Sequence, residues 1–294
     1  IAVIDDTRDV KATSHYIETP FYKINLDETV GINSIIDKKD GKDIVKHNGE
    51  YNPFIGIYER TDITSDPIEE RKIMGRNRKS ISTNRYISKL NDIQVKNKGK
   101  VYSTVELIYE LEGTKHYSVS LKVYNHIPKI TVKIKLHKES YWEPENLYLA
   151  LPFTTGDSEE FFVEKTGCII RPGIDQLPYT NKEFYLLQSG MAYVSENKGV
   201  VIALKDTPLI AMGDICHHII ELCGENDTKH NQAPVYSWVM NNFWETNFKV
   251  DLAGFYEFEY NIYTSKDLNN KNKAIKKCQT INEGLISFRY NDMN

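Results

Sequence analysis

Apolar and polar residues alternate along much of the chain, which is the pattern of β-strands with one buried face. The clearest case is a series of three segments, 101–111, 117–123 and 130–136, separated by short polar links. In the third segment, Ile130 and Val132 belong to an apolar face, while Lys133 and Lys135 lie on the opposite face. Three such strands with short links predict an antiparallel meander that is buried on one side and wet on the other.

The same pattern predicts further strands, and helix signals are scarce. An Asp-Gly pair in Lys39-Asp40-Gly41-Lys42 indicates a hairpin turn. The best helix candidate runs from Lys266 to Gln279, with Gly284 beyond it as a stop. We therefore predict a mostly-β fold, a large antiparallel two-sheet supersandwich with few short helices, formed as one domain by residues 1–294. The additional strands are expected at Phe21–Leu26, Asn146–Pro152, Gly199–Leu204 and Phe255–Tyr263.

One segment, from Glu59 to Lys98, is dense in charged residues and contains the basic run Arg76-Asn77-Arg78-Lys79. Such a run suits a phosphate-binding loop, but acidic residues are interleaved with it. The interleaving favours a solvated hairpin or a long surface loop.

Composition excludes several classes of partner. The 294 residues include 37 Lys and Arg against 41 Asp and Glu, a net charge of −4. This balance gives no general attraction to nucleic acid or to an anionic membrane surface. No stretch approaches the roughly 20 apolar residues that span a bilayer. The four Cys include no C-x-x-C pair, which favours reduced thiols over a disulfide framework.

Motifs for the common catalytic chemistries are missing from the sequence. It contains no G-x-S-x-G, no G-x-G-x-x-G and no phosphate-binding P-loop pattern. The only cluster of potential metal ligands is Cys216-His217-His218 with Cys223 nearby. Adjacent His residues in a strand point to opposite faces, so one site could hardly use both. From these residues we expect no metal at this cluster and no nucleotide cofactor.

A stiff polar loop spans Arg171 to Pro178, where two prolines and a glycine restrict the backbone. Arg171, Asp175 and Gln176 are therefore held at low entropic cost, and their side chains suit recognition of hydroxyl groups. An internal ion pair that ties the loop to the sandwich explains the same residues equally well.

A second unusual loop is expected at Tyr236–Phe248, where aromatic residues are mixed with amides and a carboxylate. Sugar sites use such a mixture, because ring faces pack on C–H surfaces and Asn side chains bond to hydroxyls. The candidates here are Asn241, Asn242, Trp244 and Asn247. The alternative is an aromatic core segment whose Asn side chains brace a bend.

At these two segments the sequence resembles glycoside hydrolase family 38, the α-mannosidases, and particularly its bacterial branch. Residues 239–248 are similar to a family stretch that reads M-N-N-Y-W-x-T-N-Y, and residues 171–178 are similar to R-P-G-x-D-Q-L-P. The resemblance covers about residues 18–263, and one departure is Tyr179, where the branch often has Gly. Flanking similarities are Lys205–Leu209, Tyr148–Phe153 and the opening segment Glu18–Val45.

The resemblance implies a specific place in a larger enzyme. Family members carry the nucleophile and the zinc ligands in an N-terminal α/β barrel, and neither the barrel pattern nor its H-x-D segment occurs here. This chain resembles the C-terminal β region, which is similar to the supersandwich of galactose mutarotases. It is then expected to be non-catalytic, to pack on its own catalytic barrel, and to shape the site for an α-mannoside. The implied substrate contacts are Arg171, Asp175, Gln176, Asn241, Asn242, Trp244 and Asn247.

Two other functions stay open at this point. A self-sufficient mutarotase-like epimerase would need a His acid and a carboxylate base that face each other. A carbohydrate-binding or assembly module would use exposed aromatics, with Trp142, Trp238 and Trp244 as candidates. A homo-oligomer is compatible with the sequence. Because the chain opens at Ile1 without Met, we expect a part of a longer protein whose signal segment is not assessable. The Ile-, Lys- and Asn-rich composition and the reduced thiols favour a bacterial, cytoplasmic origin.

Overall fold

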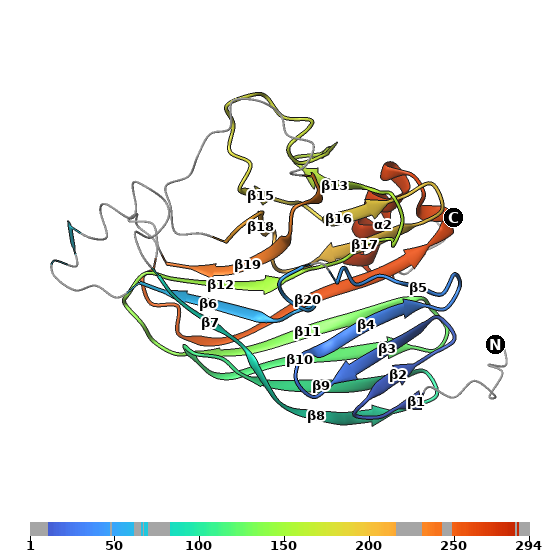
Figure 1. The fold of residues 1–294 in the computed structure, drawn as a ribbon, viewed down its shortest axis with the longest axis horizontal. Coiled ribbons are helices and arrows are strands. Elements are labelled where there is room, and N and C mark those ends of the chain that lie inside the picture. The colour runs from blue at the N-terminus through green and yellow to red at the C-terminus, as the bar shows by residue number, and fades with distance from the viewer. Residues whose placement is uncertain are drawn as a thin grey trace, which may run out of the picture.

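The computed structural model describes residues 11–47, 49–61, 66, 68–69, 83–215, 231–242, 249–285 and 287. Figure 1 shows these residues as layers of long antiparallel strands, with helical structure near the C-terminal end. The mostly-β prediction is confirmed. All of the strands predicted from the alternating pattern are present, within a few residues of their expected ends.

The strands form three sheets, in which every ladder is antiparallel. A five-stranded sheet follows the chain order and contains the predicted Asp-Gly turn between its last two strands. Its strands are β1 (Lys11–Ala12), β2 (Tyr16–Glu18), β3 (Tyr22–Asp27), β4 (Gly31–Asp37) and β5 (Lys42–Asp43).

A nine-stranded sheet is the largest element and contains the predicted meander as three neighbouring strands. Its order is β14-β13-β16-β17-β20-β11-β10-β9-β8. The strands are β8 (Lys89–Lys98), β9 (Tyr102–Glu110), β10 (Thr114–Tyr124), β11 (Lys129–Lys138), β13 (Glu160–Lys165), β14 (Cys168–Ile170), β16 (Gly190–Val194), β17 (Gly199–Leu204) and β20 (Gly254–Ser265).

A six-stranded sheet, in the order β15-β18-β19-β12-β6-β7, completes the sandwich. It brings together segments that are far apart in sequence, because β12 pairs with β6 on one side and with β19 on the other. The strands are β6 (Gly56–Arg60), β7 (Asn84–Ile87), β12 (Glu145–Ala150), β15 (Phe184–Leu186), β18 (Leu209–Met212) and β19 (Val235–Asn241).

One apolar core joins the three sheets. In β11, Ile130, Val132 and Ile134 are buried while Lys133 and Lys135 are exposed, as the alternation predicts. The core combines side chains of the nine-stranded sheet with side chains of both other sheets. The predicted two-sheet sandwich is therefore refined: the nine-stranded sheet packs against two smaller sheets (Figure 1).

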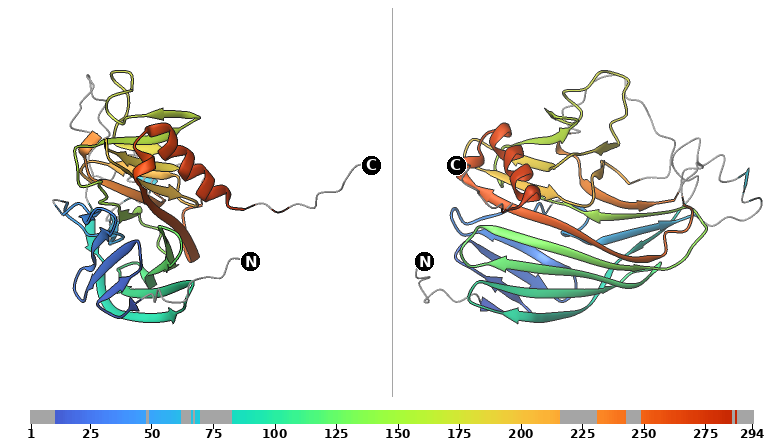
Figure 2. Two further views of the ribbon diagram at one scale, coloured as in Figure 1. Left: turned by 90° about the vertical axis from the view of Figure 1, so that its right-hand side faces the viewer. Right: turned by 180° about the vertical axis from the view of Figure 1, so that it is seen from behind.

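The predicted C-terminal helix covers the opposite face of the nine-stranded sheet (Figure 2). It consists of a 3-10 turn, η2 (Lys266–Leu268), followed by α2 (Lys271–Glu283). The Asn270 side chain caps α2 by accepting the Asn272 N–H at 2.9 Å, and Gly284 ends it with a φ of 67°. Ala274, Ile275 and Cys278 pack on small side chains of β16 and β17.

The hairpin alternative for Glu59–Lys98 agrees with the antiparallel pairing of β6 and β7. A long surface loop is wrong for the second half of the segment, which forms β7 and β8. Both are edge strands of their sheets. β8 has no fully buried side chain. An edge strand is held mainly by backbone hydrogen bonds to one neighbour, so its sequence carries little hydrophobic alternation. The basic run at 76–79 lies outside the described residues.

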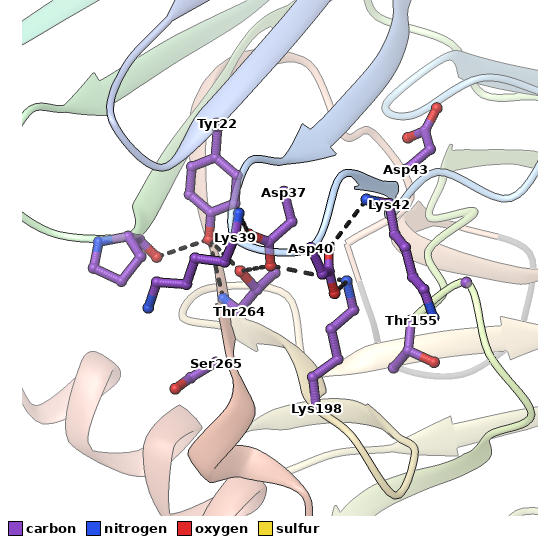
Figure 3. Close-up of polar contacts among 12 residues, drawn as sticks. Tyr22, Asp37, Lys39, Asp40, Lys42, Asp43, Thr155, Lys198, Thr264 and Ser265 are labelled. Carbon is purple, nitrogen blue, oxygen red and sulfur yellow. Dashed lines mark hydrogen bonds and ion pairs between the residues drawn. The ribbon is translucent and has the colours of Figure 1, made fainter.

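A buried polar network fastens the five-stranded sheet to the nine-stranded sheet (Figure 3). Tyr22 on β3 accepts the backbone N–H of Thr264 at 3.0 Å, and the Thr264 hydroxyl donates to Asp37 Oδ2 at 2.8 Å. The Lys198 ammonium lies 2.8 Å from Asp40 Oδ2 and 3.8 Å from Asp37 Oδ2. Burial raises the pKa of Tyr22. Because these groups are paired with one another, we interpret the network as structural.

Candidate functional site

The aromatic and amide segment predicted as a loop is in fact a strand over its first part, since residues 235–241 form β19. The alternation places Tyr236 and Trp238 on the outer face of the six-stranded sheet, away from the main core. Asn241 continues this segment and lies opposite Asn146 of β12 in the ladder. Trp244 and Asn247 lie outside the described residues.

Trp238 is packed rather than exposed, so its expected role as an exposed sugar-stacking ring is wrong. Its ring stacks on Tyr148 with centroids 5.3 Å apart and meets the edge of Phe184 at 5.8 Å. Its indole N–H donates to Asn146 Oδ1 at 3.1 Å. Trp142, in contrast, is 73% exposed. The aromatic segment therefore contributes a buried cluster to this sheet face.

Asn242 braces the bend at the end of β19, as the structural alternative anticipated. Its Oδ1 accepts the backbone N–H of Glu145 at 2.7 Å, and its Nδ2 donates to the carbonyls of Val250 and Glu143 at 2.8 and 3.0 Å. The side chain is buried. Asn241, one residue earlier, is half-buried.

Arg171 organises the stiff loop, which lies between β14 and β15 as expected. Its guanidinium donates to both oxygens of Asp175, at 2.9 and 3.1 Å, and to Glu160 Oε1 at 2.8 Å. The backbone N–H of Arg171 also donates to Asp175 Oδ2 at 2.9 Å. The guanidinium holds the pKa of Asp175 below its usual value. The internal ion pair is thus present, and a role for these residues in sugar contact stays a prediction.

Gln176 is the internal brace of the same loop. Its Oε1 accepts from the Gly173 backbone N–H at 2.9 Å and from the Tyr185 hydroxyl at 2.7 Å, and its Nε2 donates to the Asn181 carbonyl at 3.1 Å. These bonds fix the loop against β15. A contact between Gln176 and substrate also stays a prediction.

The loop presents apolar side chains to the outside. Leu177 is 77% exposed and Tyr179 is 71% exposed. Leu177 borders an open groove of about 680 Å³, in which Phe184, Leu186 and Leu209 supply further apolar surface. Tyr179 has a φ of 60°, in the left-handed region that favours glycine. We call Leu177, Tyr179, Leu186 and the groove the loop surface.

Among the described residues, the start of the second segment lies near the chain that follows the loop, whereas Asn241 does not. Phe184, just after the loop, lies across the ladder from Ala211, which in turn lies opposite Tyr236 at the start of β19. Asn241 is at the other end of that strand, roughly 20 Å from Val235 at about 3.3 Å per residue. The loop and the amides therefore belong to different regions of the six-stranded sheet.

A pocket that the sequence did not reveal lies beside the start of β19. Its lining includes Tyr51, Tyr236, Lys46 and Glu50. The residues before β6 carry no recognisable motif, so only the fold places them beside β19. Their only sequence signal is one aromatic residue beside a carboxylate.

Within the described residues, no three His, Cys, Asp or Glu side chains are grouped as metal ligands. The Cys216 cluster is not among those residues. His47 Nε2 lies 2.8 Å from Asp43 Oδ2, but the two residues are four positions apart in one segment and do not face each other across a sheet. None of the described helices is long and apolar enough to cross a bilayer.

Comparison with known proteins gives the fold a family context. No family model matches the sequence, and no curated protein sequence is similar to it. Among solved structures, an α-mannosidase from Enterococcus faecalis aligns over 87% of this chain, with a TM-score of 0.56 and 11% identity. A protein in glycosyl hydrolase family 38 from the same species aligns over 90%, with a TM-score of 0.54 and 10% identity. An α-N-acetylgalactosaminidase from Bifidobacterium bifidum, solved as a quadruple mutant, aligns over 90%, with a TM-score of 0.50 and 10% identity.

The alignments cover only part of the larger proteins. This chain matches 29% of the α-mannosidase, 32% of the family 38 protein and 38% of the acetylgalactosaminidase. At these identities the likeness is one of fold. The chain therefore has the fold of a β-sandwich portion found in glycoside hydrolases.

Proposed function

We propose that this chain is the C-terminal β-sandwich portion of an α-mannosidase-like glycoside hydrolase and that it is not catalytic by itself. The supporting observation is the fold match, which takes in 87% of this chain but only 29% of an α-mannosidase. In this proposal the catalytic residues and the zinc belong to a barrel elsewhere in the polypeptide. The segments 171–178 and 240–244 are the ones in which the sequence resembles family 38 motifs.

The loop surface is the part that we expect to contact the catalytic barrel. Its backbone is fixed by the Arg171–Asp175 pair and by the bonds of Gln176, so little conformational entropy is lost when it docks. Leu177 and Tyr179 project outward from this frame. Exposed apolar side chains on a rigid support are typical of a surface that is covered in the complete protein.

The experiment is a reconstitution. The region encoded upstream of Ile1 and the present chain are produced separately, and hydrolysis of 4-nitrophenyl α-mannoside is measured for each and for the mixture. We expect no turnover above buffer from this chain, and turnover by the mixture, with both parts eluting together in gel filtration. Turnover by this chain alone, or an upstream region without a barrel, contradicts the proposal.

Variants locate the contact within the same assay. Leu177→Asp places a charge on the loop surface and is expected to weaken co-elution at least tenfold. Val101→Asp is the matched control, because Val101 is also exposed but precedes β9, in the meander of the nine-stranded sheet. Equal loss in both variants would show that the loop surface has no special part in docking.

A further inference from the structure

A second site lies in the pocket where β12 and β19 meet the chain that precedes β6. Its volume is about 150 Å³, and its mouth is formed by exposed or half-buried residues. Pockets for drug-sized ligands enclose about 300–1,000 Å³, so this pocket suits a single small ring. The side chains that matter here are Lys46, Glu50, Tyr51 and Tyr236.

Two tyrosines give the pocket its aromatic wall. The Tyr51 and Tyr236 rings meet edge to face, with centroids 6.4 Å apart and an interplanar angle of 66°. Tyr236 is held in β19 and is almost fully buried, whereas Tyr51 is half-buried at the mouth. Tyr236 supports the Tyr51 ring from within the sheet, and the accessible part of the Tyr51 ring offers a surface against which the C–H face of a small ring can pack.

Lys46 and Glu50 at the mouth carry one charge of each sign, and the nearby Arg85, which interacts with Tyr51, is paired with Glu59. The Tyr51 hydroxyl donates to Glu50 Oε1 at 2.7 Å, which orients the carboxylate. The Lys46 ammonium donates to the Gln232 carbonyl at 2.9 Å. A carboxylate accepts several hydrogen bonds and an ammonium donates three, so both groups can bond further. The opposed charges favour a neutral ligand with hydroxyl groups over an ionic one.

From this combination we propose that the pocket binds one neutral hexopyranoside. The C–H face of the sugar packs on Tyr51, whose ring is supported by Tyr236. Adjacent hydroxyls donate to Glu50, and Lys46 donates to a hydroxyl oxygen. The site lies beside β12 and β19 and does not include the loop surface. It does not rest on the proposed packing against a barrel, because every group it uses belongs to this chain.

Binding is measured on the 294-residue chain by saturation-transfer NMR and titration calorimetry. The probes are methyl α-mannopyranoside, methyl α-glucopyranoside and methyl β-galactopyranoside, with cyclohexanol as an apolar ring of similar size and mannose 6-phosphate as a charged ligand. We expect a dissociation constant of the order of millimolar for at least one glycoside. Cyclohexanol and the phosphate should bind at least fivefold more weakly.

Two substitutions assign the signal to the pocket. Glu50→Gln keeps the shape but removes the charged acceptor, and Tyr51→Ala removes the exposed ring, so each should weaken binding at least fivefold. Glu110→Gln and Phe255→Ala are matched controls on exposed residues outside the pocket and should leave binding unchanged. If Tyr51→Ala does not fold, Glu50→Gln at the exposed mouth still decides the question.

Three results overturn the proposal: no glycoside gives saturation transfer, cyclohexanol binds as well as the sugars, or Glu50→Gln has no effect on binding. These outcomes are independent of co-elution with a catalytic barrel. A chain that binds the sugar but fails to reconstitute activity contradicts only the proposed packing role, and the reverse result contradicts only this site.

Discussion

Lys138 and Glu145 form an ion pair inside the sandwich, with Nζ 2.6 Å from Oε2 and each side chain 1% exposed. They stand at the end of β11 and the start of β12, and the Tyr58 hydroxyl donates to the same carboxylate oxygen at 2.6 Å. Burial raises the pKa of Glu145, although Lys138 and Tyr58 act in the opposite direction. The pair connects the nine-stranded sheet to the six-stranded sheet.

Removing one member of this pair should destabilise the fold strongly. Lys138→Met leaves a buried carboxylate without its partner, and such losses cost about 3–5 kcal/mol. The double variant Lys138→Met/Glu145→Leu should recover much of that loss, because it removes both charges. Urea denaturation of the wild type, both single variants and the double variant gives the coupling energy. A double variant as unstable as the sum of the two single variants would contradict the pairing.

The pH dependence of this pair follows from the direction of the Glu145 shift. A carboxyl whose folded pKa is raised binds more protons in the folded state, so its contribution is complete below the unfolded pKa, near 4.5, and is lost as pH rises through the folded pKa. The destabilisation caused by Lys138→Met should therefore be smaller below about pH 4.5 than at pH 7. Denaturation curves at both pH values test this, with Glu110→Gln as a control.

The opposite sign is expected at Asp175, whose folded pKa is lowered by Arg171. Its contribution is present above the unfolded pKa, near 3.8, and is lost as pH falls through the folded value. Both side chains are about a third exposed, so Asp175→Asn should cost at most about 1 kcal/mol at neutral pH. The variant and the wild type should become equally stable well below pH 3.8. A difference that persists there would assign the effect to the shape of the loop instead of its charge.

Alternation in the sequence predicts the interior strands because their two faces meet different environments. β11 and β20 each place apolar residues on the face that is buried and mainly polar residues on the other face. Their sequences therefore show the alternation directly. β19 does not show this alternation. The six-stranded sheet buries aromatic residues on its second face as well, around Trp238 and Tyr148, and the period of two disappears.

The sequence could predict those parts of the candidate site that are formed by residues close together in the chain. The stiffness of the Arg171–Pro178 loop follows from its prolines, its glycine and a local ion pair. Sequence proximity could not show that Asn241 lies away from that loop, because their separation depends on how β15, β18 and β19 pair. The Tyr51–Tyr236 pocket joins residues 185 positions apart (236 − 51 = 185), and only the fold brings them together.

Two glycines with nearly the same φ give a controlled test of packing near Tyr58. Gly113 and Gly41 have φ values of 76° and 75°. A Cβ at Gly113 would lie 2.5 Å from the Tyr58 ring, whereas a Cβ at Gly41 meets nothing within 4 Å. Both Ala variants carry the left-handed penalty of about 1–2 kcal/mol. Gly113→Ala should cost roughly 1–3 kcal/mol more, since the ring that holds Glu145 must move. Equal unfolding free energies would contradict this packing.

Tyr179 combines a strained backbone with an exposed ring. Replacing it should therefore affect the stability of the chain and its association with the barrel in opposite directions. Its φ of 60° costs a non-glycine residue about 1–2 kcal/mol of stability, which glycine would not lose. Glycine, however, is more flexible in the unfolded chain, and this offsets roughly 0.5–1 kcal/mol of the benefit. Tyr179→Gly should therefore stabilise the isolated chain by up to about 1 kcal/mol in urea denaturation.

The same variant should weaken association with the catalytic barrel, because it removes an apolar ring that is 71% exposed in this chain. Tyr179→Asn is the matched control for the backbone, since Asn tolerates the left-handed region but also lacks the ring. Both variants should co-elute less with the upstream region while neither loses stability. If Tyr179→Gly is more stable and still associates as well as the wild type, the strained tyrosine has no function in assembly and the prediction is wrong.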